Sequence, residues 1–128
     1  MFCGIDIIEV SRIKSALLEN NNFKYKIFSK NEITDIDKIK SDVKYQRYAG
    51  RFAAKEAIYK AISKILIDNN LTIEFNEIEI ENIETLKRRP KVNILNNKIN
   101  KLLDDYTIDI SISHIEENAT AICTVNLK

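Results

Sequence analysis

Apolar and polar residues alternate at the start of the chain, and this period of two indicates an extended strand. The alternation over residues 3–8 predicts a strand with Asp6 on one face and three apolar side chains on the other: Cys3, Ile5 and Ile7. The period then lengthens, and apolar residues at helical spacing predict a helix over residues 9–18. The asparagines at positions 20–22 should end this helix.

Two further helices are predicted before the middle of the chain. Ser29 and Glu32 have the spacing of a capping box, so a helix should begin at Ser29. The longest helix should cover residues 42–67, because small and apolar side chains repeat along one stripe of it: Phe52, Ala53, Ala57, Ala61 and Ile65.

The period of two returns in the second half of the chain. It predicts strands over residues 71–75 and 77–81, a short extended piece over 90–95, and a hairpin of strands over 107–113 and 119–125. A helix is expected over residues 97–105. This order of elements predicts an α+β fold, with an N-terminal strand and helices followed by an antiparallel sheet, in a single domain over residues 1–128.

Composition narrows the functional classes. A length of 128 residues suits one compact domain, and a content of 45% hydrophobic and 30% charged residues argues against disorder. The formal net charge of +1 gives no global field that would favour nucleic acid or a membrane surface. The chain has no apolar run of membrane-spanning length, and Cys3 and Cys123 are expected to be reduced core residues of a cytoplasmic protein.

Two acidic residues stand in apolar surroundings. Glu56 lies close to the apolar stripe of the long helix, where a carboxylate needs a base or a metal as its partner. Its spacing to Lys60 also fits a solvated ion pair. Asp6 interrupts an apolar strand, and the nearby Gly4 would permit close approach of a ligand or another backbone. The alternative for Asp6 is an exposed position on an edge strand.

Two other features are weaker signals. Ser113 and His114 end a predicted strand at a tight turn, where a histidine is usually just exposed. The first helices carry a group of basic residues that fits either a solvated face or a docking patch for an acidic protein: Arg12, Lys14, Lys24, Lys26 and Lys30.

Together, and in this order, these features resemble a known family. The segments are Gly-Ile-Asp at 4–6, Ile-Phe-Ser-Lys-Asn-Glu at 27–32, Arg-Phe-Ala-Ala-Lys-Glu-Ala at 51–57, and Ser-Ile-Ser-His at 111–114. Over residues 4–125 the sequence resembles the holo-acyl-carrier-protein synthases, the small 4′-phosphopantetheinyl transferases. The Arg-Phe-Ala-Ala-Lys-Glu-Ala segment is the most specific of the four.

The resemblance implies an enzyme that transfers 4′-phosphopantetheine from coenzyme A to a serine of apo acyl carrier protein, with release of 3′,5′-ADP, in support of fatty acid biosynthesis. It implies Mg²⁺ bound by Asp6 and Glu56, with both residues and Lys60 in catalytic roles. The implied coenzyme A contacts are Arg51, Lys60, Pro90, Ser113 and His114, and the implied carrier-protein contacts are Arg12, Lys24 and Lys26. Mg²⁺ prefers oxygen ligands, and the coenzyme A pyrophosphate would complete its shell.

The resemblance further implies a homotrimer with sites shared between subunits, so that His114 would act across an interface from Asp6 and Glu56. The predicted hairpin agrees, because its apolar side chains offer more sheet surface than few helices would cover: Ile108, Ile110, Ile112, Ala119, Ala121, Cys123 and Val125.

Two segments depart from the family pattern. Residues 62–68 contain no glycine where relatives carry a Gly-Thr-Gly-like loop, and residues 87–90 are Lys-Arg-Arg-Pro where many relatives carry Asn-Gly-Lys-Pro. A catalytically impaired relative that still binds carrier protein or coenzyme A is therefore one alternative. A second is nucleic-acid binding, which the near-neutral charge argues against, through five basic and aromatic residues: Tyr45, Arg47, Tyr48, Arg51 and Phe52.

Overall fold

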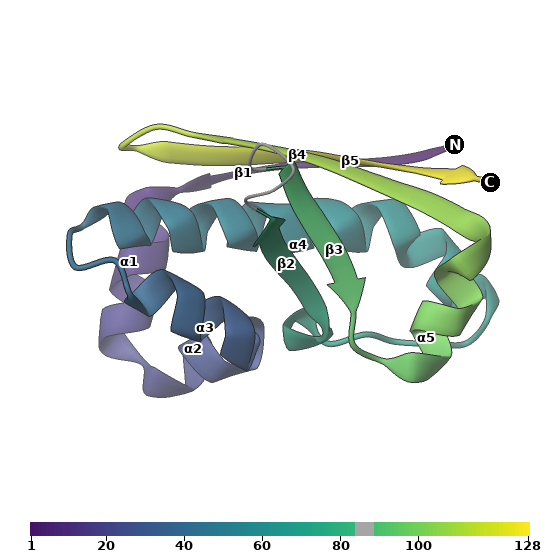
Figure 1. Ribbon diagram of the computed structural model, residues 1–128, viewed down its shortest axis with the longest axis horizontal. Coiled ribbons are helices and arrows are strands. Elements are labelled where there is room, and N and C mark those ends of the chain that lie inside the picture. The colour runs from purple at the N-terminus through teal and green to yellow at the C-terminus, as the bar shows by residue number, and fades with distance from the viewer. Residues whose placement is uncertain (84–88) are drawn as a thin grey trace.

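A long helix at the centre of the molecule packs between a three-stranded antiparallel sheet and a second layer of shorter elements (Figure 1). The computed structural model describes residues 1–83 and 89–128. The elements are β1 (Phe2–Glu9), α1 (Val10–Glu19), α2 (Asn21–Ile27), α3 (Lys30–Asp37), α4 (Val43–Asp68), the 3₁₀ turn η1 (Phe75–Glu77), β2 (Ile78–Ile83), β3 (Arg89–Ile94), α5 (Asn97–Leu102), the 3₁₀ turn η3 (Leu103–Asp105), β4 (Tyr106–His114) and β5 (Asn118–Leu127). The predicted α+β fold is confirmed.

The central sheet joins the two ends of the chain. Its strand order is β1-β5-β4, all antiparallel, and β2 pairs with β3 in a separate two-stranded sheet. The register places Asp6 opposite Ala121, which in turn lies opposite Ile112 of β4. Asp6 is therefore held by a strand more than a hundred residues away in sequence.

Small residues let α4 lie close to this sheet. The buried residues of β5 are small or medium in size, and α4 presents five buried alanines to the core: Ala49, Ala53, Ala54, Ala57 and Ala61. At Gly4 the approach is closest, since a Cβ there would lie 1.9 Å from the carbonyl oxygen of Ala57. Gly4 therefore accommodates the backbone of a helix, one of the two options that the sequence left open.

The alternating apolar residues of β1 lie on its exposed face. Ile5 and Ile7 are 63% and 68% exposed, and Cys3 is exposed as well, so the prediction that Cys3 is a core residue is wrong. Asp6 instead lies on the face toward α4. A period of two separates the faces of a strand but does not say which face is buried, and here Gly4 and its contact with α4 decide it.

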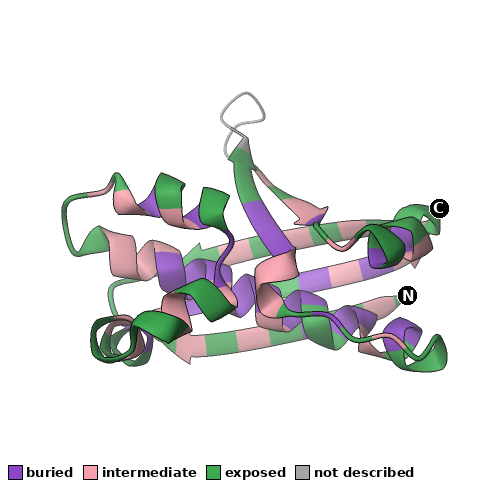
Figure 2. Ribbon diagram, turned by 90° about the horizontal axis from the view of Figure 1, so that it is seen from below, coloured by how far each residue is buried: buried purple, intermediate pink, exposed green. Residues whose placement is uncertain are grey.

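The sheet surface that no helix covers is not the one expected from the hairpin residues. The apolar residues of the hairpin pack against α4, where the core is concentrated (Figure 2). No described element covers the opposite face of the sheet in Figure 1, and that face carries the exposed Ile5, Ile7 and Ile122.

Most of the helices match their predictions. The capping box at Ser29 is present, with Ser29 Oγ accepting from Glu32 N and Glu32 Oε1 accepting from Ser29 N, and α4 matches the predicted long helix within a residue. The helix α2 was not predicted, because the Asn20 side chain accepts from Asn22 N and so begins a new helix at the same asparagines that end α1.

The predicted strand over residues 71–75 is wrong. Residues 71–74 have no regular structure and η1 follows them. The amide of Leu71 donates to Leu66 O at the end of α4, and Phe75 O accepts from the Lys55 ammonium, so these backbone groups are not part of a strand ladder. None of the helices described is long and apolar enough to cross a membrane.

Candidate active site

Three of the predicted site residues meet where β1 lies on α4. Glu56 and Lys60 are one turn apart on α4, and Asp6 comes from the face of β1 toward this helix. Lys60 Nζ lies 3.2 Å from Asp6 Oδ1 and donates to Ile5 O at 2.8 Å. The side chain of Lys60 is 50% exposed and that of Asp6 16%, so the group opens to solvent on the lysine side.

The charges of this group are not balanced. Burial raises the pKa of the Glu56 carboxyl, the charge of Asp6 raises it further, and the Lys60 ammonium lowers it. Two carboxylates thus share one nearby ammonium, and a divalent cation would relieve the excess of negative charge. The oxygen donors suit Mg²⁺. Among the described residues there is no group of three or more His, Cys, Asp or Glu that could hold a metal, so waters or a ligand's oxygens would have to complete the shell.

A second group of predicted residues lines an open cavity of about 610 Å³ elsewhere on the chain. Arg51, Pro90 and His114 all contribute to its wall. Arg51 is buried and pairs with Asp35 at 3.0 Å, which holds the guanidinium in place. Ser113 is exposed and is not among the lining residues, whereas Ser111, two residues earlier in β4, is.

The histidine of this cavity sits in cationic surroundings. His114 Nδ1 lies 3.0 Å from Gln46 Oε1, and burial followed by the charge of Arg47 lowers the pKa of the imidazole. Asp6, Glu56 and Lys60 do not line the cavity. Within one chain, the acidic group and the cavity are therefore separate.

Two cationic residues of the cavity were not among the coenzyme A contacts that the resemblance implied. Arg47 and Arg89 both line it, and within the described part of the chain the Nε of Arg47 is buried without a hydrogen-bond partner. Arg47 precedes Arg51 by one helical turn, so the spacing could have indicated their shared face. An anion would find three guanidinium groups here.

The predicted partner-binding residues divide into two kinds. Arg12 and Lys26 are exposed. Lys24 is partly buried, pairs with Asp37 at 2.6 Å and lies over the ring of Tyr48. Tyr48 itself is buried and donates to Asp37, so it offers no face for stacking a base, which weakens the nucleic-acid alternative.

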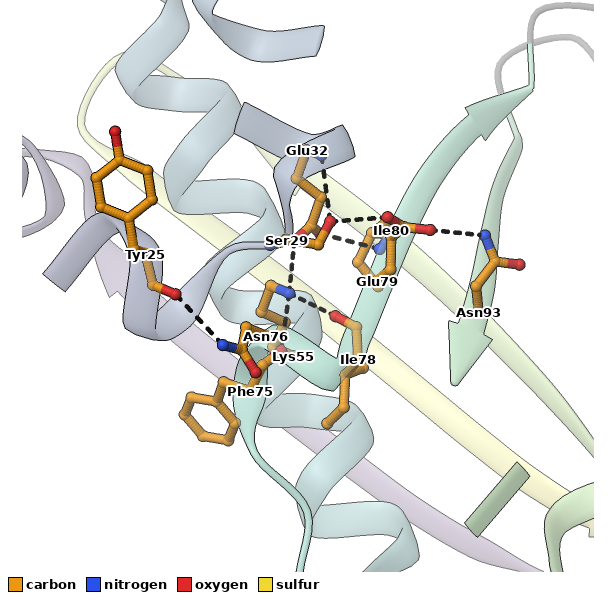
Figure 3. Close-up of polar contacts among 10 residues, drawn as sticks. All are labelled: Tyr25, Ser29, Glu32, Lys55, Phe75, Asn76, Ile78, Glu79, Ile80 and Asn93. Atoms are coloured by element: carbon orange, nitrogen blue, oxygen red, sulfur yellow. Dashed lines mark hydrogen bonds and ion pairs between the residues drawn. The ribbon is translucent and has the colours of Figure 1, made fainter. Parts of the chain in front are cut away.

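A buried polar cluster around Lys55 and Glu32 was also missed (Figure 3). Lys55 Nζ lies 2.7 Å from Glu32 Oε1, and both side chains are fully buried. Lys55 also donates to Phe75 O and Ile78 O, while Glu32 accepts from the amides of Ser29 and Ile80. Burial lowers the pKa of the Lys55 ammonium, and the Glu32 carboxylate opposes this effect. The cluster ties α4 to α3, η1 and β2.

The two departures from the family pattern fall in different places. Residues 62–68 continue α4 to its end at Asp68, with Ile62, Ile65 and Leu66 buried, so this segment is helical. Lys87 and Arg88 lie outside the described residues, and Arg89 and Pro90 begin β3.

Comparison with known proteins gives a consistent result. Residues 2–123 match the 4′-phosphopantetheinyl transferase superfamily. The chain is 38% identical over 120 residues to a holo-[acyl-carrier-protein] synthase of Clostridium tetani, with 92% of this chain and 89% of the relative covered. It is 41% identical over 123 residues to the synthase of Clostridium beijerinckii, covering 92% and 90%.

Solved structures agree with the sequence comparison. The holo-(acyl-carrier-protein) synthase of Bacillus anthracis, in complex with CoA (3′,5′-ADP), matches with a TM-score of 0.77 at 29% identity and covers 99% of this chain and 96% of that one. The ACPS-CoA complex of Chronobacterium ammoniagenes matches with a TM-score of 0.81 at 26% identity, covering 98% and 96%.

Proposed function

The chain belongs to the 4′-phosphopantetheinyl transferase superfamily and is an enzyme of that type, and on this premise we propose that it modifies a serine of apo acyl carrier protein with the 4′-phosphopantetheine of coenzyme A. The observation that carries the proposal is the convergence of Asp6, Glu56 and Lys60 from β1 and α4. In the reaction, the serine oxygen bonds to the β-phosphorus of coenzyme A, and the bond from that phosphorus to the leaving 3′,5′-ADP breaks.

Asp6 and Glu56 are the residues that would hold Mg²⁺. The ion supplies charge neutralisation of the pyrophosphate and polarisation of the phosphorus under attack. Lys60, whose ammonium lies 3.2 Å from Asp6 Oδ1, would stabilise the negative charge that develops on the same phosphates. Asp6 of β1 and Glu56 of α4 are both partly buried, which limits the positions of their carboxylates, and such positioning is the main contribution that a phosphoryl-transfer site makes.

Coenzyme A is assigned to the cavity on the basis of its cations. Arg51 is fixed by Asp35, and Arg47 and Arg89 line the same cavity, so the nucleotide phosphates would meet positive charge there, with His114 beside them as a hydrogen-bonding group. Pro90 contributes an apolar edge. Ser113, next to His114 in β4, would be a further contact.

A shared site between subunits would reconcile the separate positions of the acidic group and the cavity. We propose a homotrimer in which His114 of one subunit faces Asp6 and Glu56 of the next. The uncovered sheet face with Ile5 and Ile7 offers apolar surface for such an assembly.

Mixing of inactive variants tests the shared site. Glu56→Ala and His114→Ala chains are each inactive in this scheme, but a hybrid trimer contains an interface at which both residues are intact. Mixed chains should regain activity after subunit exchange, which is followed by native mass spectrometry. Exchange without any return of activity contradicts the shared site.

Further properties follow from the proposed reaction. Residues 1–128 would act as one transferase domain, in the cytoplasm, where thiols such as that of Cys123 stay reduced, and the modified carrier protein would serve fatty acid biosynthesis. Arg12, Lys24 and Lys26 would face the acidic carrier protein.

The decisive experiment is incubation with apo acyl carrier protein, coenzyme A and Mg²⁺, followed by intact-mass measurement. The carrier protein should gain one phosphopantetheine, and omission of Mg²⁺ or addition of EDTA should prevent the gain. Binding of both substrates without any mass change would instead identify the chain as an impaired relative that only binds them.

A further inference from the structure

The Lys60 ammonium lies on the carboxylate that the proposed function assigns to the metal. Its Nζ is 3.2 Å from Asp6 Oδ1 and is anchored a second time by Ile5 O at 2.8 Å. A divalent cation that binds Asp6 must therefore either displace the Lys60 ammonium from Asp6 Oδ1 or bind close to this positive charge and be repelled by it.

The position of Lys60 allows it to move away. Half of its side chain is exposed, and a lysine reaches through a flexible four-carbon stem. One of its two contacts is to a backbone carbonyl and the other is a partly exposed ion pair, so leaving them costs little. An arriving polyphosphate would offer the ammonium a stronger partner than either.

We propose that Lys60 is a built-in competitor for the metal, which keeps the affinity of Asp6 and Glu56 for a divalent cation low until the phosphates of coenzyme A draw the ammonium away. The proposal rests on the proposed function and concerns the order of binding at that site. Metal and coenzyme A then bind cooperatively, because each weakens the same contact between Lys60 and Asp6.

Lys64 provides a matched control on the same helix. It lies one turn beyond Lys60, is exposed and pairs with Asp68 at 2.9 Å. Lys64→Met removes the same charge from α4 as Lys60→Met does, at a position that does not contact Asp6.

The test measures binding of Mn²⁺, which prefers the same oxygen ligands as Mg²⁺ and whose free form has an electron paramagnetic resonance signal. In the absence of coenzyme A, Lys60→Met should bind Mn²⁺ about tenfold more tightly than the wild type, since a charge next to the ligand oxygen is removed. Lys64→Met and the charge-preserving Lys60→Arg should bind within about twofold of the wild type. At saturating coenzyme A, the advantage of Lys60→Met should shrink to about threefold or less.

Asp6→Asn separates failure of this inference from failure of the proposed function. If Asp6→Asn binds Mn²⁺ as the wild type does, the metal is not at Asp6 and both the metal assignment and the competition are wrong. If Asp6→Asn loses Mn²⁺ but Lys60→Met binds it no more tightly than the wild type, only the competition is overturned. An equal gain in Lys64→Met would also overturn it, because the effect would then be a general one of helix charge.

Discussion

Two lysines of α4, five positions apart, use the same charge in opposite ways. Lys55 is fully buried, and its ammonium contacts Glu32 and two backbone carbonyls of other elements. Lys60 is half exposed and contacts only Asp6 and Ile5 O among the described residues. A rotation of about 140° along the helix separates them, so one points to α3 and β2 and the other to the edge of β1.

The difference shows what burial does to a cation. The partners of Lys55 cannot be replaced by water, so its charge is committed to holding four elements together (Figure 3). Water can replace the partners of Lys60, so its charge is available to a substrate. Changes at the buried lysine should therefore affect stability first, and changes at the open site should affect turnover first.

The largest effect on stability is expected from Lys55→Met. It leaves the buried Glu32 carboxylate without a cation, which should lower the free energy of unfolding by about 3–5 kcal/mol. Lys60→Met, the partner in the comparison, should change it by less than about 1 kcal/mol. Urea denaturation measures both. Equal losses of unfolding free energy in the two variants would mean that the buried Lys55 and the half-exposed Lys60 contribute to stability in the same way.

A double variant sharpens this result. Adding Glu32→Gln to Lys55→Met removes the uncompensated charge and keeps one acceptor oxygen, which can serve either Ser29 N or Ile80 N, the two amides that donate to different oxygens of Glu32. Part of the lost stability should return. If the double variant is less stable than Lys55→Met alone, the loss comes from packing and not from the buried charge.

At the open site, Asp6→Asn and Glu56→Gln should reduce turnover strongly and stability little, the reverse of the effect expected at Lys55. Each keeps the shape of its side chain but removes a carboxylate charge, so kcat/KM should fall by about 10²–10³-fold. Thermal melting should shift by only a few degrees at most, since neither residue is part of the buried cluster. A melting shift as large as that of Lys55→Met would mean that the acidic group is structural.

Lys24 and Lys26 show a smaller contrast of the same kind, because Lys24 is partly buried in an ion pair and Lys26 is exposed. Arg12→Glu with Lys26→Glu should raise the KM for carrier protein about fivefold at low salt, leave the KM for coenzyme A unchanged and lose its effect as salt rises. Lys24→Glu should also lower stability, because it breaks the pair with Asp37. If KM for the carrier protein does not respond to either change or to salt, this face does not dock it.

The smallest effect on stability is expected from a change at His114. Its pKa is lowered by burial and by Arg47, so the folded state favours the neutral ring. That contribution to stability is present above the usual histidine pKa of 6.5 and is lost as pH falls through the lowered value. His114→Gln should flatten the dependence of the free energy of unfolding on pH below 6.5, because the substituted side chain does not titrate. An unchanged slope would mean that the ring titrates as in the unfolded chain.

The sequence predicted those parts of the molecule that local period or motif order determines. The long helix and the Ser29 cap follow from spacing alone, and the meeting of Asp6 with Lys60 follows from the family pattern. The partner of Lys55 did not follow, because Glu32 lies on another helix and no local spacing links them. Residues 71–74 alternate like a strand but form no ladder, since Leu71 N donates to Leu66 O at the end of α4 and the following residue, Phe75, accepts from Lys55.

The contact between Gly4 and Ala57 has a consequence for the evolution of the protein. A single methyl group at position 4 would collide with the Ala57 carbonyl, a rigid backbone atom, and would push β1 off α4 together with Asp6. At Gly50, by contrast, an added methyl would lie 3.2 Å from a side-chain methyl of Ile112 and 3.8 Å from His114 Cδ2, and a small side-chain shift can relieve the closer contact. Position 50 can therefore accept a small side chain more readily than position 4, where the absence of a Cβ lets β1 lie close enough to α4 to hold Asp6 beside Lys60.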